Sequence, residues 1–191
     1  PRGRGYGDPS QRCFKFRDGE KAIGAISFDP RFLSDIGSAE DKEGTVPKNH
    51  GLAVSSSGYA SRMAFHPFLE PSTRAGRKFA RVREGEEIVG IHKVQGVETA
   101  ILATREGRVI LFPAAEVNFL SGPGRGVLGI KLSKTDKVIG STVSSDPKQG
   151  LVVCTAGGRQ IRVNPGHYRV ASRAGKGVQV IKRGGLTRVE R

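Results

Sequence analysis

A glycine-rich segment in the middle of the chain is the first candidate for chemistry. Gly124-Arg125-Gly126-Val127-Leu128-Gly129 matches the G-x-G-x-x-G pattern of dinucleotide-binding turns. That pattern binds a pyrophosphate only where a helix follows it, because the helix N-terminus supplies the amide donors. Here Ile130-Lys131-Leu132 and a polar turn follow. The sequence therefore favours a bend between repeated elements, and we expect no nucleotide cofactor.

The other candidates for catalysis or metal binding are isolated residues. Gly175-Lys176 lacks the upstream glycine and the following Ser or Thr of a phosphate-binding loop. The histidines and cysteines stand far apart: His50, His66, His92, His167, Cys13 and Cys154. None has a second ligand at metal-binding spacing, and no Ser, Cys or His lies in a recognisable nucleophile motif. We expect reduced thiols, no metal and no catalytic residue.

The charge of the chain indicates a polyanionic partner. Lys and Arg number 32 against 18 Asp and Glu, which gives a formal net charge of +14. Nucleic acid and an anionic membrane surface would both attract such a protein. The apolar stretches are interrupted by charge well short of the roughly 20 residues that a membrane span needs, and no basic amphipathic helix is visible. We therefore expect nucleic acid and no membrane.

Three kinds of segment recur in a fixed order at a spacing of about 50 residues, which is within the range of propeller blades. A polar turn followed by Ile or Val and then Gly occurs at residues 17–24, 83–90 and 133–140. A strand, a glycine turn and a second strand occur at 100–113 and 151–165, with a looser copy at 52–67. A basic segment occurs at 77–82, 124–132 and 173–182, with glycine inside the last two copies and directly before the first.

These short segments predict an all-β, propeller-like fold of four-stranded units, because no helical periodicity is sustained anywhere. Three units are clear, and residues 1–11 and 186–191 leave open a fourth unit formed by the two ends. We expect residues 1–191 to form a single domain, with the locally acidic residues 30–49 as a surface insertion loop. The start at Pro1 instead of Met suggests a piece of a longer protein.

The cations of this fold are the expected binding residues. After Leu120 they greatly outnumber the acids, whereas a merely solvated face would intersperse both signs. Equivalent positions in a radial fold lie along one rim, where cations can follow a phosphate backbone. The expected contacts are Arg77, Lys78, Arg81, Arg108, Arg125, Lys131, Arg159, Arg162, Arg169, Arg173, Lys176, Lys182 and Arg183. Because Trp and a recognition-helix motif are absent from the sequence, we expect sequence-independent contact with the phosphates of duplex DNA.

Residues 103–110, 124–132 and 157–182 together resemble blades of the C-terminal domain of the A subunit of bacterial type IIA topoisomerases, DNA gyrase and topoisomerase IV. The resemblance implies a β-pinwheel that wraps or bends duplex DNA and presents it to a separate breakage-reunion core of the same polypeptide, which works with an ATPase B subunit. It implies a non-catalytic domain of an ATP-dependent type II DNA topoisomerase, cytoplasmic, nucleoid-associated and monomeric when isolated. Tyr6, Tyr59 and Tyr168 lack the sequence context of the catalytic tyrosine of that core.

Residues 171–177 are the nearest match to the Q-R-R-G-G-K-G box that gyrase needs for introducing negative supercoils. Arg173, Gly175, Lys176 and Gly177 are kept, whereas the Gln, the first Arg and one Gly are lost. This degenerate box favours topoisomerase IV, or a gyrase whose true box lies outside residues 1–191, so both enzymes stay open. A second hypothesis also stays open: a propeller-like protein-interaction module whose basic rim binds an acidic partner.

Overall fold

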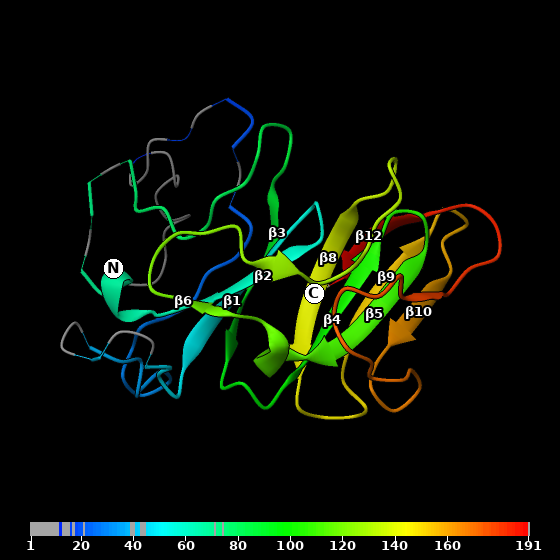
Figure 1. The fold of residues 1–191 in the computed structure, drawn as a ribbon. Helices are drawn as coiled ribbons and strands as arrows, with labels where there is room; N and C mark the ends of the chain where they lie inside the picture. Colours follow the sequence, from blue (N-terminus) through cyan, green and yellow to red (C-terminus); the bar gives the residue numbers. More distant parts are fainter. Residues whose placement is uncertain are drawn as a thin grey trace, which may run out of the picture.

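The computed structural model describes residues 12, 16, 18–20, 22–38, 41–42, 45–70, 72–73 and 75–190. Over these residues the chain forms twelve strands and two short 3-10 helices, η1 (His66–Phe68) and η2 (Ala114–Glu116). The strands make three sheets that lie side by side across the molecule (Figure 1). None of the helices in this part of the chain is long and apolar enough to cross a membrane. The predicted all-β repeat fold is confirmed.

Each sheet contains one β-hairpin. The three hairpins are β1 (His50–Ser55) with β2 (Tyr59–Met63), β4 (Thr99–Thr104) with β5 (Arg108–Pro113), and β9 (Leu151–Thr155) with β10 (Gln160–Val163). The glycine that ends each turn, Gly58, Gly107 or Gly158, has a positive φ. Glycine adopts that conformation without a steric penalty, so the turn sets the register of the two strands.

Strands that follow the hairpins in sequence complete the inner edges of the sheets. β3 (Ile88–Val94) pairs with β1, β8 (Val138–Ser144) with β4, and β12 (Leu186–Glu190) with β9, all antiparallel. β3 packs against β8, and β8 packs against β12. A Cβ atom on Gly90 of β3 would overlap Ser141, and one on Gly140 of β8 would overlap Val189. The repeated Ile-or-Val-Gly pair therefore allows neighbouring sheets to converge at their inner edges.

Strands from the following repeat complete the outer edges of the first two sheets. β7 (Val127–Leu128) pairs with β2, and β11 (Val178–Gln179) pairs with β5, although each of them comes after the next hairpin along the chain. β6 (Phe119–Leu120) pairs in parallel with the far end of β2. The second sheet accordingly has the predicted four strands, in the order β11-β5-β4-β8.

The third sheet has the order β10-β9-β12. Residues 186–190, for which the sequence left open a fourth unit, form its inner strand β12 instead. Residues 1–11, the other half of that unit, lie outside the described residues. The described part of residues 30–49 forms turns and bends, in which Leu33 and Pro47 are buried.

Two clusters of apolar side chains fill the space between neighbouring sheets. Successive residues of a strand point to opposite faces, so Leu102 of β4 packs toward the first sheet and Ile101 packs toward the third. Phe112 and Leu111 of β5 divide in the same way. Each of these four side chains is at most 2% exposed, and burying one contributes about 1.5–3 kcal/mol. The β4–β5 hairpin therefore packs against both the first and the third sheet, and it fixes the position of the outer strands that pair with these hairpins.

Candidate nucleic-acid interface

The three basic segments of the sequence lie next to one another at the outer side of the sheets. A parallel bridge joins Ala80 to Gly124, and another joins Ile130 to Gly175. The amide of Arg81 donates to the Gly124 carbonyl at 3.0 Å, and the amide of Lys131 donates to the Gly175 carbonyl at 2.8 Å. We call residues 75–82, 124–132 and 174–182 the outer band.

The segments of the outer band are structurally equivalent. Gly76, Gly126 and Gly177 all adopt a left-handed backbone, with φ of 75°, 78° and 68°. A Cβ atom would overlap the carbonyl oxygen of Ala60 at Gly126 and that of Val109 at Gly177. These two glycines are therefore the points at which the band reaches the hairpins, and the bend expected at residues 124–129 is confirmed.

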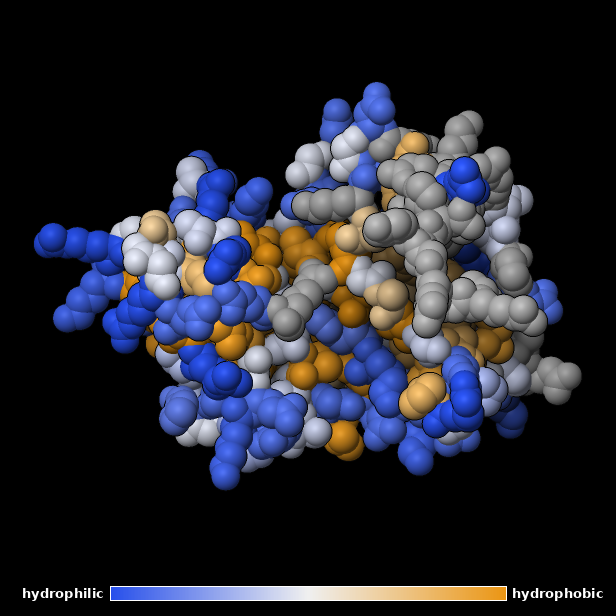
Figure 2. Space-filling view, turned by 180° about the vertical axis from the view of Figure 1, so that it is seen from behind, coloured by the Kyte–Doolittle hydropathy of each residue, from blue (hydrophilic) through white to orange (hydrophobic). Residues whose placement is uncertain are grey.

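Most of the predicted contacts are solvent-accessible. Ten of the thirteen cations are exposed: Arg77, Lys78, Arg81, Lys131, Arg159, Arg162, Arg169, Lys176, Lys182 and Arg183. Figure 2, which is seen from behind, shows hydrophilic side chains projecting from its left end, and this end is the right end of Figure 1, where the third sheet lies. Arg81 and Lys131 occupy equivalent positions on the band, because each follows the residue that bridges to the next segment. The fold thus repeats an exposed cation along its outer side.

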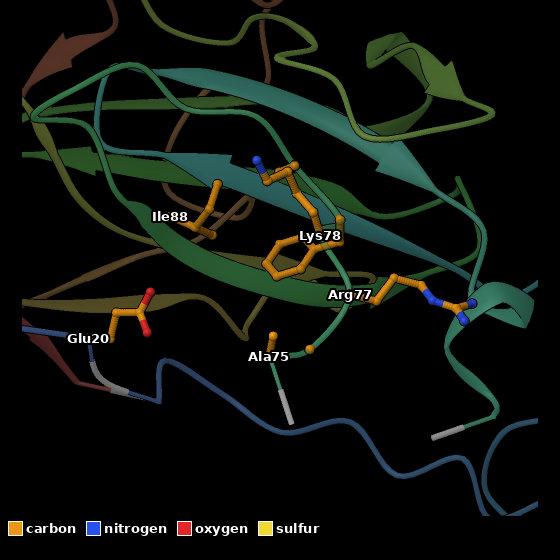
Figure 3. A pocket seen from close by; sticks show the side chains of 8 residues that line it. Glu20, Ala75, Arg77, Lys78 and Ile88 are labelled. Carbon is orange, nitrogen blue, oxygen red and sulfur yellow. The ribbon is translucent and has the colours of Figure 1, made fainter. Parts of the chain in front are cut away.

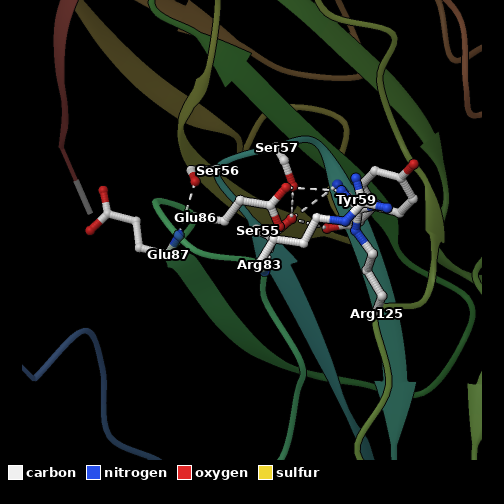
Figure 4. A network of polar contacts seen from close by, with 8 residues as sticks. All are labelled: Ser55, Ser56, Ser57, Tyr59, Arg83, Glu86, Glu87 and Arg125. Atoms are coloured by element: carbon white, nitrogen blue, oxygen red, sulfur yellow. Dashed lines mark hydrogen bonds and ion pairs between the residues drawn. The ribbon is translucent and has the colours of Figure 1, made fainter.

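Arg125 is engaged inside the protein (Figure 4). Its Nη2 lies 2.9 Å from Oε1 of Glu86, and its Cζ lies 3.7 Å from the centre of the Tyr59 ring. Partial burial opposes ionisation of Glu86, but hydrogen bonds from the Arg83 amide and the Ser57 hydroxyl, together with Arg125, hold the pKa of this carboxyl below its usual value. The Arg125 side chain is 26% exposed. Its charge is balanced and largely covered.

Arg173 and Arg108 also contact the backbone. The Arg173 Nε donates to the Glu116 carbonyl at 3.0 Å, and its Nη1 donates to the Leu128 carbonyl at 3.3 Å. Arg173 thereby links η2 to β7. The Arg108 Nη1 lies 3.4 Å from the carbonyl oxygens of both Lys176 and Gly177, which is a longer and weaker contact. Nothing in the sequence spacing pairs these arginines with their partners.

Gly175, Lys176 and Gly177, which match the degenerate box, form the bend in the third segment of the outer band. Gly177 lies against Val109, Lys176 is exposed, and Arg173 is held by Glu116. Gly175-Lys176-Gly177 therefore repeats the arrangement of Gly124-Arg125-Gly126 one sheet further on.

The described residues contain no cluster of His, Cys, Asp or Glu that could hold a metal ion. Cys154 is a buried free thiol, whereas Cys13 and Tyr6 lie outside the described residues. His92 Nε2 and Ser141 Oγ are 2.9 Å apart, which the sequence did not predict, but Ser141 is 2% exposed within the inner strands. We interpret this contact as a core hydrogen bond.

A hollow of about 580 Å³ borders the first segment of the outer band (Figure 3). Glu20, residues 75–80 and Ile88 line it. The Arg77 guanidinium points away from Glu20 and donates to the Pro67 carbonyl (Figure 3). The hollow has one acid in its lining and no paired carboxylates or nucleophile–base pair, so its described lining offers no catalytic constellation.

The similarity of the chain to known proteins covers the same three repeats. A sequence model of the family described as "DNA gyrase C-terminal domain, beta-propeller" matches residues 52–95, 98–145 and 151–185. These matches begin at the three hairpins and together cover more than half of the chain.

Among curated proteins, the DNA gyrase A subunit of Helicobacter pylori strain 26695 is 33% identical over 58% of this chain and 13% of its own length. The DNA gyrase A subunit of Haloquadratum walsbyi is 27% identical over 86% of this chain and 19% of its own length. The chain thus spans less than a fifth of either relative. A solved C-terminal domain of DNA topoisomerase IV superposes with a TM-score of 0.79 over 96% of this chain and 54% of that domain, at 17% identity. That likeness concerns the fold.

Proposed function

The chain belongs to the family described as "DNA gyrase C-terminal domain, beta-propeller". We therefore propose that it binds duplex DNA along the outer band as a non-catalytic accessory domain of a type IIA topoisomerase. One observation carries the proposal. The two parallel bridges, Ala80 to Gly124 and Ile130 to Gly175, join the three basic segments into one surface. Repeated cations on one continuous surface suit a repeating chain of phosphates.

The expected contacts are with phosphates instead of base edges. Lys and Arg side chains that neutralise phosphates release condensed counterions, so binding weakens steeply with salt and depends little on sequence. Over the described residues the band consists of strands and bends, and it presents no helix that could enter a major groove. This surface therefore has no element that could read base edges.

The geometry also favours bent DNA. The band runs along the outer edges of the first and second sheets, where β7 pairs with β2 and β11 pairs with β5, so DNA that contacts its whole length must follow the outer side of the domain. Added phosphate contacts would offset the cost of bending, which is of order 1–6 kcal/mol for a bend of 40–90°. DNA held in this way would be presented to the cleavage core of the parent A chain, which works with the ATPase B subunit in the nucleoid.

The experiment is a salt titration of duplex binding by fluorescence anisotropy, with two duplexes of unrelated sequence. The variant Arg81→Ala/Lys131→Ala/Lys182→Ala should lower the slope of log K against log salt by about 3 on both duplexes, since each phosphate contact contributes about 1. The matched control is Lys48→Ala/Lys93→Ala/Lys148→Ala, which removes three exposed cations outside the band.

Equal slopes for the two triple variants would exclude the band as the DNA-binding surface. Absence of salt-dependent binding by the unaltered protein would overturn the proposed function itself. In that case, capture of an acidic protein that survives nuclease treatment would support the protein-interaction hypothesis.

A further inference from the structure

The outer band meets the hairpins at two joints with the same backbone geometry. Tyr59 of β2 pairs with Leu128, and Arg108 of β5 pairs with Gln179. Arg125 and Lys176 stand three residues before those partners, so they are equivalent. An acid is equivalent as well, because Glu86 precedes β3 by the same two residues by which Asp136 precedes β8. The first joint is Tyr59, Glu86 and Arg125, and the second joint is Arg108, Asp136 and Lys176.

The first joint is closed and electrically balanced. The Arg125 guanidinium contacts both the Tyr59 ring and the Glu86 carboxylate. Glu86 is only 16% exposed, and Arg125 Nε is buried without a hydrogen-bond partner among the described residues. A phosphate at this guanidinium would compete with Glu86 for Nη2.

The second joint carries different side chains on the same frame. Arg108 replaces the tyrosine, so a second cation stands where the first joint has an aromatic cover. Asp136 is buried, and its Oδ1 accepts hydrogen bonds from the amides of Glu106 and Lys137 at 2.9 and 2.8 Å, while its Oδ2 is buried without a donor among the described residues. No carboxylate of this described part of the chain lies within ion-pair distance of Arg108 or Lys176.

Glu106 is an acid near this joint, and its carboxylate is hydrogen-bonded to two hydroxyl groups. Its carboxylate accepts hydrogen bonds from the Thr135 and Ser133 hydroxyls at 2.6 and 2.9 Å. These hydroxyls, assisted by the charges of Arg105 and Arg108, lower the pKa of Glu106. The carboxylate thus has hydroxyl partners and forms no ion pair with Lys176.

The cations of the second joint are brought close by the backbone. The Arg108 guanidinium rests on the carbonyls of Lys176 and Gly177, which places it beside the Lys176 main chain. The Lys131 amide donates to the Gly175 carbonyl, so a third cation, the exposed Lys131, is bonded to the residue before Lys176. An arginine offers a planar pair of donors to a phosphate, and a lysine adds a mobile point charge.

We infer that the second joint is a phosphate-binding site, in which Arg108 and Lys176 hold one phosphodiester group, whereas the first joint is a structural lock. This inference rests on the proposed function and assigns different roles to two equivalent positions of the band. It follows that phosphate contacts are stronger at the outer edge of the second sheet than at the outer edge of the first.

Salt titrations of duplex binding test the inference with matched substitutions. Arg108→Gln/Lys176→Gln should lower the slope of log K against log salt by about 1 to 2. Arg125→Gln, at the position equivalent to Lys176, should leave the slope unchanged and instead lower the thermal midpoint of unfolding. Equal slope losses for the two variants, or an unchanged slope for Arg108→Gln/Lys176→Gln, would overturn the inference while the proposed function stands.

A second measurement does not depend on DNA. Pyrophosphate is titrated into the isotope-labelled protein while the arginine Nε–H and backbone amide signals are recorded by NMR. Signals of Arg108, Lys176 and Gly177 should shift before those of Arg125. Unshifted signals at the second joint, or first shifts at Arg125, would overturn the inference even if duplex binding failed altogether.

Discussion

The Cζ atom of Arg125 lies 3.7 Å from the centre of the Tyr59 ring, so a residue of the outer band is stacked on the first residue of β2. A cation over an aromatic face is attracted by about 0.5–2 kcal/mol, depending on how far both are desolvated. Tyr59→Leu should therefore lower the free energy of unfolding by an amount in that range, because the Glu86 ion pair remains. Urea denaturation followed by circular dichroism measures the change.

Tyr59→Phe is the control for that substitution. It keeps the ring face and removes only the hydroxyl, so its stability should stay close to that of the unaltered protein. A loss as large for Phe as for Leu would show that the ring contact with Arg125 is not the source of the effect.

The bends of the outer band give a second prediction. Gly126→Ala and Gly177→Ala should each destabilise the protein by more than the about 1–3 kcal/mol of a strained backbone alone, because the new Cβ would also overlap the carbonyl of Ala60 or Val109. Hydrogen exchange should accelerate at the β7–β2 pairing in the first variant and at the β11–β5 pairing in the second.

Gly76→Ala separates backbone strain from steric overlap. Gly76 has a φ of 75°, but no described atom lies within 4 Å of a Cβ placed on it. Gly76→Ala should therefore lower the free energy of unfolding only by the cost of the left-handed conformation, about 1–2 kcal/mol. If Gly76→Ala were as damaging as Gly126→Ala, the close approach to Ala60 would have no energetic role.

The sequence predicted the repeated units well because their signals are local. Glycine turns between short apolar runs mark the hairpins, and the Ile-or-Val-Gly pair marks the inner strands β3 and β8, where Gly90 and Gly140 allow close packing. It did not predict that β7 would join β2 and β11 would join β5. Such pairings depend on contacts between residues far apart in the chain, which no local pattern encodes.

The same distinction applies to the candidate site. The expected row of exposed cations is present at Arg81, Lys131 and Lys182. Arg125 looks identical to them in the sequence, yet its partners lie 39 and 66 positions away in the chain. Glu86 and Tyr59 become its neighbours only when β7 and β3 have joined the β1–β2 hairpin in the first sheet, so composition and spacing could not reveal that its charge is balanced.

A buried histidine predicts a dependence of stability on pH. His50 Nδ1 lies 2.9 Å from the Pro47 carbonyl and donates to it, which leaves Nε2, 3.2 Å from Arg62 Nη1, as an acceptor. Burial, together with the charge of Arg62, lowers the pKa of His50, although the Pro47 carbonyl opposes the shift. The folded protein therefore favours the neutral ring.

The lowered pKa of His50 determines how stability changes with pH. The stabilisation is complete above the ordinary histidine pKa of about 6.5 and is lost as the pH falls below it, because the unfolded chain takes up the proton more readily. Urea titrations between pH 8 and 5.5 should show this loss in the unaltered protein. His50→Asn, which retains a donor for Pro47, should be less stable at pH 8 and should have a flatter profile. Parallel profiles would exclude His50 as the responsible group.

The inner edges of the sheets give the last prediction. A Cβ on Gly140 of β8 would overlap the side chain of Val189 in β12, so Gly140→Ala should cost about 1–3 kcal/mol, the usual penalty for overpacking. Gly140→Ala/Val189→Ala removes the overlapping methyl groups, so the double variant should be more stable than the sum of the two single changes implies. Gly157→Ala is the control, since the nearest atom to its Cβ is 3.9 Å away. Strict additivity in this cycle would show that β8 and β12 do not meet through these two residues, and the convergence of the second and third sheets would then need another cause.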